Sequence, residues 1–193
     1  MSSVFELIRR RAMCRRYQDR AVPVAHLNRI LEAARRAPSA GHSQGVRFGV
    51  TTDPVRRQAI ADAFGEQEYL AKGFQPWLSV APVHIVACLS EASYQERYAA
   101  PDKSGDPSDW PVSYPVMDVG QALMTLYLAA EECGLSCGYL GPHAGPDLVK
   151  MLDLPQEWRF MGLITLGYRL GTTRKTRSIK RGWREFDEVV RWI

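Results

Sequence analysis

The first residues able to do chemistry form an arginine cluster near the start of the chain. Five arginines fall within eight positions, with no acid among them: Arg9, Arg10, Arg11, Arg15 and Arg16. A basic run of this kind is usually a solvated face or a weak nucleic-acid patch. Here it adjoins apolar Met13, Cys14 and Tyr17, so we expect part of it to be buried. A buried guanidinium needs an anion beside it, which makes these arginines candidates for binding an anionic ligand.

The second such stretch spans residues 37–48 and reads Ala-Pro-Ser-Ala-Gly-His-Ser-Gln-Gly-Val-Arg-Phe. Pro38 disfavours helical geometry at Ala37, so a preceding helix should end there. The small and polar residues that follow leave backbone N–H groups uncovered and let another group approach closely. A loop of this kind between a helix and a strand suits gripping the polar edge of a flat ring. An ordinary helix-to-strand connection explains the stretch equally well.

No side chain stands out as a nucleophile, a general acid–base group or a metal ligand. The sequence has no P-loop, Gly-x-Ser-x-Gly or His-Glu-x-x-His motif, and no Gly-x-Gly-x-x-Gly after a strand. The four cysteines form no Cys-x-x-Cys pair and have no histidine cluster, which argues against zinc. His42 and His143 are more typical of polar loop residues than of proton donors, and His84 is more typical of a buried strand.

Length and composition indicate one globular domain over residues 1–193. Hydrophobic residues make up 46% of the chain, and the net charge of +4 suits an anionic small molecule as well as nucleic acid. The start lacks the apolar segment of a signal peptide, and the longest apolar stretch, 116–130, is too short to span a bilayer. We therefore expect a cytoplasmic protein with free thiols and no membrane association.

Caps, periodicity and apolar runs predict the elements that position these residues. Ser3 and Glu6 form a capping box, which predicts a helix that buries Phe5, Leu7 and Ile8. Further helices are predicted over 27–36, 54–64 and 147–152, and strands over 46–51, 82–89, 135–140 and 160–168. The polar segment 91–114 is expected to be a mobile, lid-like excursion over a pocket.

The strongest predicted helix covers residues 116–132. It carries no charge from Val119 to Ala130, so we expect it to be buried on nearly every side, either in the core or in a dimer interface. The chain also ends on an apolar segment, 189–193, that needs cover. Both features favour a second copy of the chain as partner.

Taken together, these signals resemble the nitroreductase family of FMN-dependent oxidoreductases over essentially the whole chain. The main carriers are Arg11-Ala12-Met13-Cys14-Arg15-Arg16-Tyr17 and Ala37-Pro38-Ser39-Ala40-Gly41-His42-Ser43-Gln44-Gly45, supported by 118–120, 134–135, 166–168 and 180–190. The resemblance implies an α+β sandwich: a mainly antiparallel central sheet with flanking helices, in an intertwined homodimer. It also implies that the C-terminal arm, 169–193, packs on the partner and that FMN lies between the subunits.

The resemblance also assigns cofactor-binding positions, which are Arg11, Ala12, Met13, Arg15, Pro38, Ser39, Ala40, Gln44, Leu140, Gly141, Arg181 and Arg184. Arg11 and Arg15 would bind the FMN phosphate and reach the ring edge, as guanidinium chemistry allows. The loop at 38–40, with Gln44, would meet the flavin from the partner subunit. Leu140 and Gly141 would lie beside flavin N5, and the two tail arginines at the phosphate.

The chain departs from the family pattern in places that bear on the acceptor more than on the cofactor. Ala12-Met13 stands where many members have Arg-Ser, so one polar contact is missing, and His42 and Gly45-Val46 replace Asn and Pro-Trp. Trp183 stands where another basic residue is common.

The expected activity is transfer of electrons from NAD(P)H through flavin to a nitroaromatic, quinone or similar acceptor, with no catalytic amino acid and no metal. One alternative is a specialised branch that fragments flavin or dehydrogenates a substrate. Another is a non-enzymatic protein that binds flavin or nucleic acid. The uncharged helix and the lack of a basic–aromatic stacking surface argue against nucleic acid.

Overall fold

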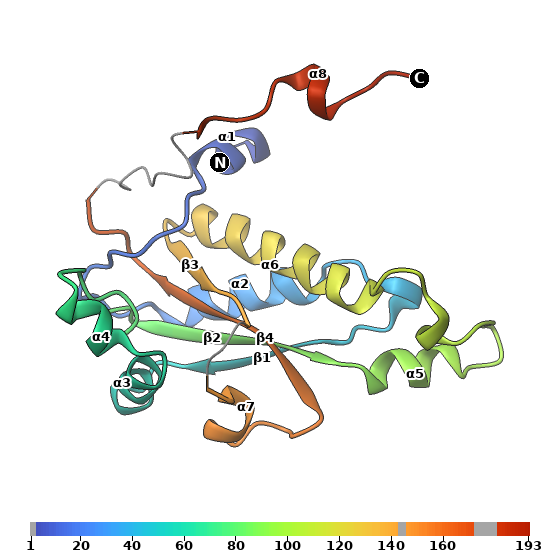
Figure 1. The fold of residues 1–193 in the computed structure, drawn as a ribbon, viewed down its shortest axis with the longest axis horizontal. Coiled ribbons are helices and arrows are strands. Elements are labelled where there is room, and N and C mark those ends of the chain that lie inside the picture. The colour runs from blue at the N-terminus through green and yellow to red at the C-terminus, as the bar shows by residue number, and fades with distance from the viewer. Residues whose placement is uncertain (1–2, 143–145, 172–180) are drawn as a thin grey trace.

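The protein is described by a computed structural model that covers residues 3–142, 146–171 and 181–193. A four-stranded antiparallel sheet in the order β1-β2-β4-β3 forms its centre (Figure 1). The strands are β1 (Val46–Thr51), β2 (Val83–Ser90), β3 (Ser136–Leu140) and β4 (Trp158–Gly167). All four predicted strands are confirmed, although β4 begins two residues earlier than expected.

Helices cover both faces of this sheet, as the predicted sandwich requires (Figure 1). One face carries α1 (Val4–Arg10), α2 (Val24–Arg35) and α6 (Tyr114–Glu132), and the other carries α3 (Pro54–Ala63), α4 (Glu66–Ala71) and α7 (Leu148–Met151). Along β2, Ile85, Ala87 and Leu89 join the first core, whereas Val86 and Cys88 join the second. Every residue of β2 is buried because the strand has neighbours on both edges and both faces.

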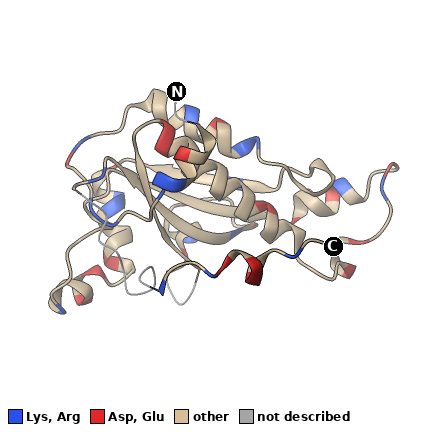
Figure 2. Cartoon of the chain, turned by 90° about the horizontal axis from the view of Figure 1, so that it is seen from above, with Lys and Arg blue, Asp and Glu red and all other residues tan. Residues whose placement is uncertain are grey.

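Local sequence signals account for most helix boundaries. Ser3 and Glu6 make both hydrogen bonds of the capping box, and the Asp53 side chain accepts from the Val55 N–H at the start of α3. Helix α2 ends at Arg35, before Pro38, as predicted. Charged residues of both signs are interspersed along these elements (Figure 2). None of the helices in the described ranges combines the length and apolarity that crossing a bilayer requires.

One expectation about burial was wrong. Of the α1 residues predicted to be buried, only Leu7 is, whereas Phe5 and Ile8 lie 71% and 44% exposed on the outer side of a short helix. Segment 91–114, predicted to be a mobile, lid-like excursion, contains α5 (Ala92–Tyr98) and a 3-10 turn (Pro107–Asp109), and its role as a lid stays a prediction. Its Tyr94 is buried in the main core.

Helix α6 is also less enclosed than predicted. Its inner face is buried, but Val116, Met117 and Met124 are 39%, 52% and 37% exposed. Together with Gly120, these residues recur at helical spacing and make one outward apolar stripe. The last helix, α8 (Phe186–Val189), lies in a tail that stands away from the sheet (Figure 1). Trp183, Trp192 and Ile193 on this tail are almost fully exposed.

His84 on β2 is a core residue, as predicted. It is fully buried, and its Nε2 lies 2.9 Å from the Leu78 carbonyl oxygen, with which it hydrogen-bonds. The pKa of His84 is lowered from 6.5 to about 4, mainly by burial. The hydrogen bond to Leu78 acts in the opposite direction, and the nearby charge of Arg57 lowers the pKa further. The folded state therefore binds fewer protons than the unfolded state between these two pH values.

We predict that His84 makes stability rise between about pH 4 and 6.5. Its contribution to the free energy of unfolding is about 3 kcal/mol. This contribution is fully present above the His84 pKa of the unfolded state and is lost as the pH falls through the lower pKa of the folded state. His84→Gln should flatten this slope, measured by urea unfolding across the range. If wild-type and variant curves stay parallel, another group carries the pH dependence.

Candidate cofactor-binding site

Two buried carboxylates on α6 hold the segments that carry the predicted site residues. Asp118 lies near the N-terminal end of the helix and Glu131 near its C-terminal end, and both side chains are buried. Thirteen residues separate them, which corresponds to about 20 Å along the helix axis. Each carboxylate accepts hydrogen bonds from a different part of the chain.

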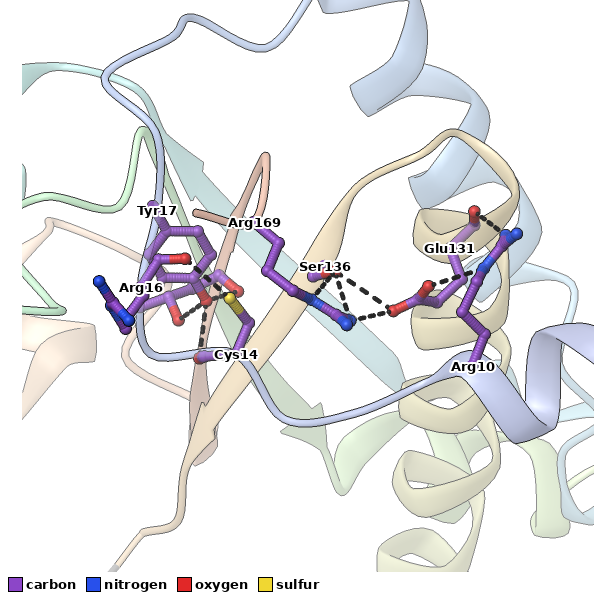
Figure 3. A network of polar contacts seen from close by, with 8 residues as sticks. Arg10, Cys14, Arg16, Tyr17, Glu131, Ser136 and Arg169 are labelled. Carbon is purple, nitrogen blue, oxygen red and sulfur yellow. Dashed lines mark hydrogen bonds and ion pairs between the residues drawn. The ribbon is translucent and has the colours of Figure 1, made fainter. Parts of the chain in front are cut away.

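Glu131 joins two arginines from distant parts of the sequence (Figure 3). Its Oε2 lies 3.3 Å from Arg10 Nε and its Oε1 lies 3.0 Å from Arg169 Nη2. Arg10 also donates to the Glu131 carbonyl, and Arg169 donates to Ser136 Oγ on β3. The network therefore fixes the end of α1, and with it the start of the arginine segment, against α6 and β3.

The arginine segment then runs along the edge of the sheet. The Cys14 N–H donates to the Cys137 carbonyl on β3 at 2.7 Å, and the Tyr17 hydroxyl lies 2.7 Å from Thr165 Oγ1. A Cβ atom at Gly138 would lie 2.4 Å from the Cys14 carbonyl oxygen, so only glycine permits this close approach. Cys14 is a buried packing residue, and its thiol donates to the Arg16 carbonyl.

Arg11 and Arg15 are left with their charges unmatched in this arrangement. Arg15 is exposed, and its guanidinium carbon lies 5.2 Å from the centre of the Trp77 ring. Arg11 is half-buried. In the part of the chain that the structure describes, neither forms an ion pair with a carboxylate.

The neighbouring predicted residues divide between core and surface. Ala12 and Met13 are half-buried between the two arginines, and Met13 packs against the main core. Leu140 and Gly141 end β3, a few residues beyond the point where Cys14 contacts it, and both are half-buried. The segment and this strand end therefore lie on the same edge of the sheet.

Sequence reasoning missed the group that supports Arg15. Glu66, at the start of α4, is buried and accepts hydrogen bonds from the backbone N–H groups of Trp77, Leu78 and Ser79 at 2.7, 2.6 and 3.1 Å. Burial alone would raise the pKa of this carboxyl, but the hydrogen bonds outweigh it and leave the pKa lowered. Glu66 thereby fixes the loop whose Trp77 ring lies under Arg15. No local sequence motif indicates that the Glu66 carboxylate binds a loop that begins eleven residues later.

At the other end of α6, Asp118 anchors the loop that follows α2. Its Oδ2 accepts from the Ala40 N–H at 2.9 Å, while Ser39 Oγ accepts from the Gln44 N–H at 2.9 Å. His42 and Gln44 have positive φ angles of 59° and 50°, which cost about 1–3 kcal/mol each in residues other than glycine. Pro38 and Gln44 are exposed, and Ser39 and Ala40 are half-buried. The loop is a strained but closely tied connection.

Asp118 also accepts from the hydroxyl of buried Tyr94 on α5, at 2.8 Å. Burial, and then the Asp118 carboxylate, raise the pKa of this phenol. The Trp110 ring packs edge-on against Tyr94 and Tyr98, so these aromatic residues form a packed cluster beside the loop.

The predicted site residues therefore fall into separate groups within one chain. Arg10, at the start of the arginine segment, is anchored at Glu131 and the 38–44 loop at Asp118, and these two anchors are about 20 Å apart along α6. Arg181 and Arg184 are exposed on the tail and contact neither group. Residues 172–180 of the predicted arm, and His143, lie outside the described residues.

Comparison with known proteins gives a consistent result. A family model described as "Nitroreductase family" matches residues 8–168. The chain is 28% identical over 153 residues to a 5,6-dimethylbenzimidazole synthase from Rhodospirillum rubrum, covering 72% of this chain and 69% of that protein. It is 28% identical over 167 residues to an FMN reductase (NAD(P)H) from Bacillus subtilis, covering 81% of this chain and 61% of that one.

The fold has close counterparts among solved structures. The nitroreductase family protein from Streptococcus pneumoniae TIGR4 superimposes with a TM-score of 0.76, over 99% of this chain and all of that chain. The sequence identity is 19%, so this likeness concerns the fold alone.

We predict that Asp118→Ala lowers the free energy of unfolding by about 2–4 kcal/mol, because it leaves the Ala40 N–H and the Tyr94 hydroxyl without a partner. Tyr94→Phe removes one of these hydrogen bonds and should cost about 1 kcal/mol. Urea unfolding measures both effects. Hydrogen exchange at residues 39–44 should accelerate in Asp118→Ala only. Equal destabilisation by the two variants would mean that Asp118 does not anchor the loop.

Proposed function

Because the chain belongs to the nitroreductase family, we propose that it is an FMN-dependent oxidoreductase that passes electrons from NAD(P)H to an electrophilic acceptor, such as a nitroaromatic or a quinone. The observation that carries this proposal is the pair of arginines, Arg11 and Arg15, that have no carboxylate partner among the described residues. They lie on a segment tied down on both sides by Glu131 and β3.

The donors that the chain offers fit FMN. A phosphate dianion suits a guanidinium, and the tail adds two exposed arginines, Arg181 and Arg184, of which Arg184 pairs with Glu188 at 3.7 Å. The flat Trp77 ring holds the Arg15 guanidinium at the edge of the sheet, where it can meet a ring edge. Leu140 and Gly141 add a small, half-buried surface at the end of the same strand.

In this function FMN, when bound, supplies the hydride and electron transfer. Arg15 would stabilise the negative charge that reduction places on the ring edge, and Arg11 would hold the phosphate. Ser39 and the backbone of the 38–40 loop would orient the ring and the acceptor. We assign no amino acid as a nucleophile.

A homodimer would bring the two groups of site residues together. If the apolar stripe of α6 packs against the same stripe of a second copy in antiparallel fashion, the N-terminal end of one helix lies beside the C-terminal end of the other. The 38–44 loop of one chain then faces the Arg11–Arg15 segment of its partner. The exposed Phe5 and Ile8 on α1 and the exposed apolar tail would also find cover in such an assembly.

The similarity to the 5,6-dimethylbenzimidazole synthase of R. rubrum favours a second candidate function. A specialised branch of the family that fragments reduced flavin would use the same binding residues. The two functions differ in the fate of the cofactor, since FMN is regenerated in the first and consumed in the second. FMN content after aerobic turnover distinguishes them.

The proposal is tested by flavin binding, reduction and potential. The purified chain should take up FMN, and NADH or NADPH should bleach the bound flavin without air. Arg15→Ala should lower the flavin midpoint potential, because the lost charge-assisted contact, about 1.5–3 kcal/mol, falls mainly on the reduced ring. A chain that does not bind FMN at high micromolar concentration would rule the proposal out.

Arg181→Ala serves as the control for this division of roles. The phosphate keeps its charge in both redox states, so this variant should weaken FMN retention and leave the potential nearly unchanged. Equal shifts of the potential in the two variants, measured at saturating FMN, would show that our assignment of Arg15 to the ring edge is wrong.

The dimer is tested by charging the stripe. Met117→Asp should raise the dimer dissociation constant by at least about a hundredfold, because it buries an unpaired carboxylate, and FMN retention should fall with it. Val55 on α3 is 74% exposed on the other side of the sheet, so Val55→Asp is the matched control and should stay dimeric. Light scattering over a concentration series measures both. A Met117→Asp dimer as tight as the wild type would contradict this interface.

A further inference from the structure

A hollow opens beside the 38–44 loop. Its volume is about 530 Å³, and it is lined by His42, Ser43, Gln44, Arg47, Ser93, Glu96, Arg97 and Ala100. Gln44 and Arg47 also line a smaller cavity of about 200 Å³ that includes Pro38 and Ser39. The hollow therefore adjoins, at these two residues, the loop assigned to the flavin.

Arg47 is held in a fixed position at this junction. Its Nη1 donates to the carbonyl oxygens of Gln44 and Val46 at 2.5 and 3.1 Å, and its Nη2 donates to Ser93 Oγ at 2.9 Å. All three partners are neutral acceptors. These hydrogen bonds fix the guanidinium without cancelling its charge, and the side chain is half-buried.

The charge balance of the hollow differs between its two arginines. Arg97 makes two hydrogen bonds to Asp102, at 2.8 and 2.6 Å, and a third to the Gly41 carbonyl, so its charge is matched. Arg47 forms no ion pair within the described ranges. One acid, Glu96, lines the hollow; it is exposed on α5, and its carboxylate would repel an anion bound there.

We propose that this hollow is a subsite for an anionic group, a carboxylate or a phosphate, on a small molecule that reacts at the flavin. Arg47 would bind the anion, with the side-chain amide of Gln44 as a neighbouring donor, whereas the hydroxyls of Ser43 and Ser93 already donate to the Ala40 carbonyl and to Ser90 Oγ. The inference rests on the proposed function, because it takes the 38–44 loop to face the flavin. The anion has two sources: a carboxylate on the acceptor, or the 2′-phosphate of NADPH as the dinucleotide donor.

The strained backbone of the loop agrees with this role. His42 and Gln44 keep left-handed conformations because Ser39, Arg97 and Arg47 bind the loop from three sides. A loop fixed in this way presents its donors without reorganisation, which favours binding of a small charged group.

The test compares matched substrates that differ in one anionic group. The acceptors are 4-nitrobenzoate and its methyl ester, and the donors are NADH and NADPH. In Arg47→Gln the ratio of kcat/KM for the acid to that for the ester should fall by at least about tenfold if the acceptor carries the anion. If the donor carries it, the NADPH-to-NADH ratio should fall instead. Either fall supports the subsite and identifies its source.

Two further variants separate charge from loop damage. Glu96→Gln removes the opposing charge and should raise whichever ratio Arg47→Gln lowers, and Arg47→Lys should restore part of it. General damage to the loop would lower kcat/KM for both substrates of a pair and leave their ratio unchanged. Unchanged ratios in Arg47→Gln, for acceptors and donors alike, would overturn the subsite.

A binding measurement keeps the subsite separate from the proposed activity. Calorimetric titration of 4-nitrobenzoate, and in parallel of NADP⁺, into the FMN-loaded wild type and Arg47→Gln requires no turnover. If neither acceptor is reduced, the proposed function fails, and the titrations then decide the subsite alone. Binding of either probe that weakens at least about tenfold in Arg47→Gln supports it. If neither probe binds the wild type, or if each binds both proteins equally, the subsite is overturned.

Discussion

Two buried carboxylates on one helix, Asp118 and Glu131, are the contacts on which the rest of the site depends. Each replaces lost hydration with hydrogen bonds from segments that are distant from it in the chain. Helix α6 sets the spacing between them at about 20 Å. The loop and the arginine segment therefore occupy positions determined by a single rigid element.

The elements themselves could be predicted from the sequence because their signals are local. The Ser3–Glu6 capping box, the Asp53 cap, the stop before Pro38 and the apolar runs of β2 and β4 each act over a few residues, and the structure confirms them. Burial was less predictable, because it depends on what lies opposite. Phe5, Ile8 and Met117 look like core residues in the sequence, yet they are exposed because no described part of the chain covers them.

The supports of the candidate site lay beyond sequence reasoning for a different reason. Glu66 caps the loop under Arg15, and Asp118 ties Ala40 to Tyr94, so each contact joins residues that are distant in the chain. In the sequence alone, a single acidic residue among apolar ones can be either a buried, hydrogen-bonded carboxylate or an exposed charge. The fit of Arg47 between three neutral acceptors is likewise visible only once the loop, β1 and α5 are in place.

A site divided between the two ends of one helix has a consequence for assembly. Within one chain, α6 holds the anchors of the two groups, Asp118 and Glu131, about 20 Å apart. In the proposed dimer, two-fold symmetry would bring them together, and FMN would bind both chains at once. By mass action, a ligand that binds only the dimer also stabilises the dimer. In that dimer the second chain would cover the apolar stripe of α6, and the FMN bound between the chains would supply the anion that Arg11 lacks. Both features of the single chain would thus have the same explanation.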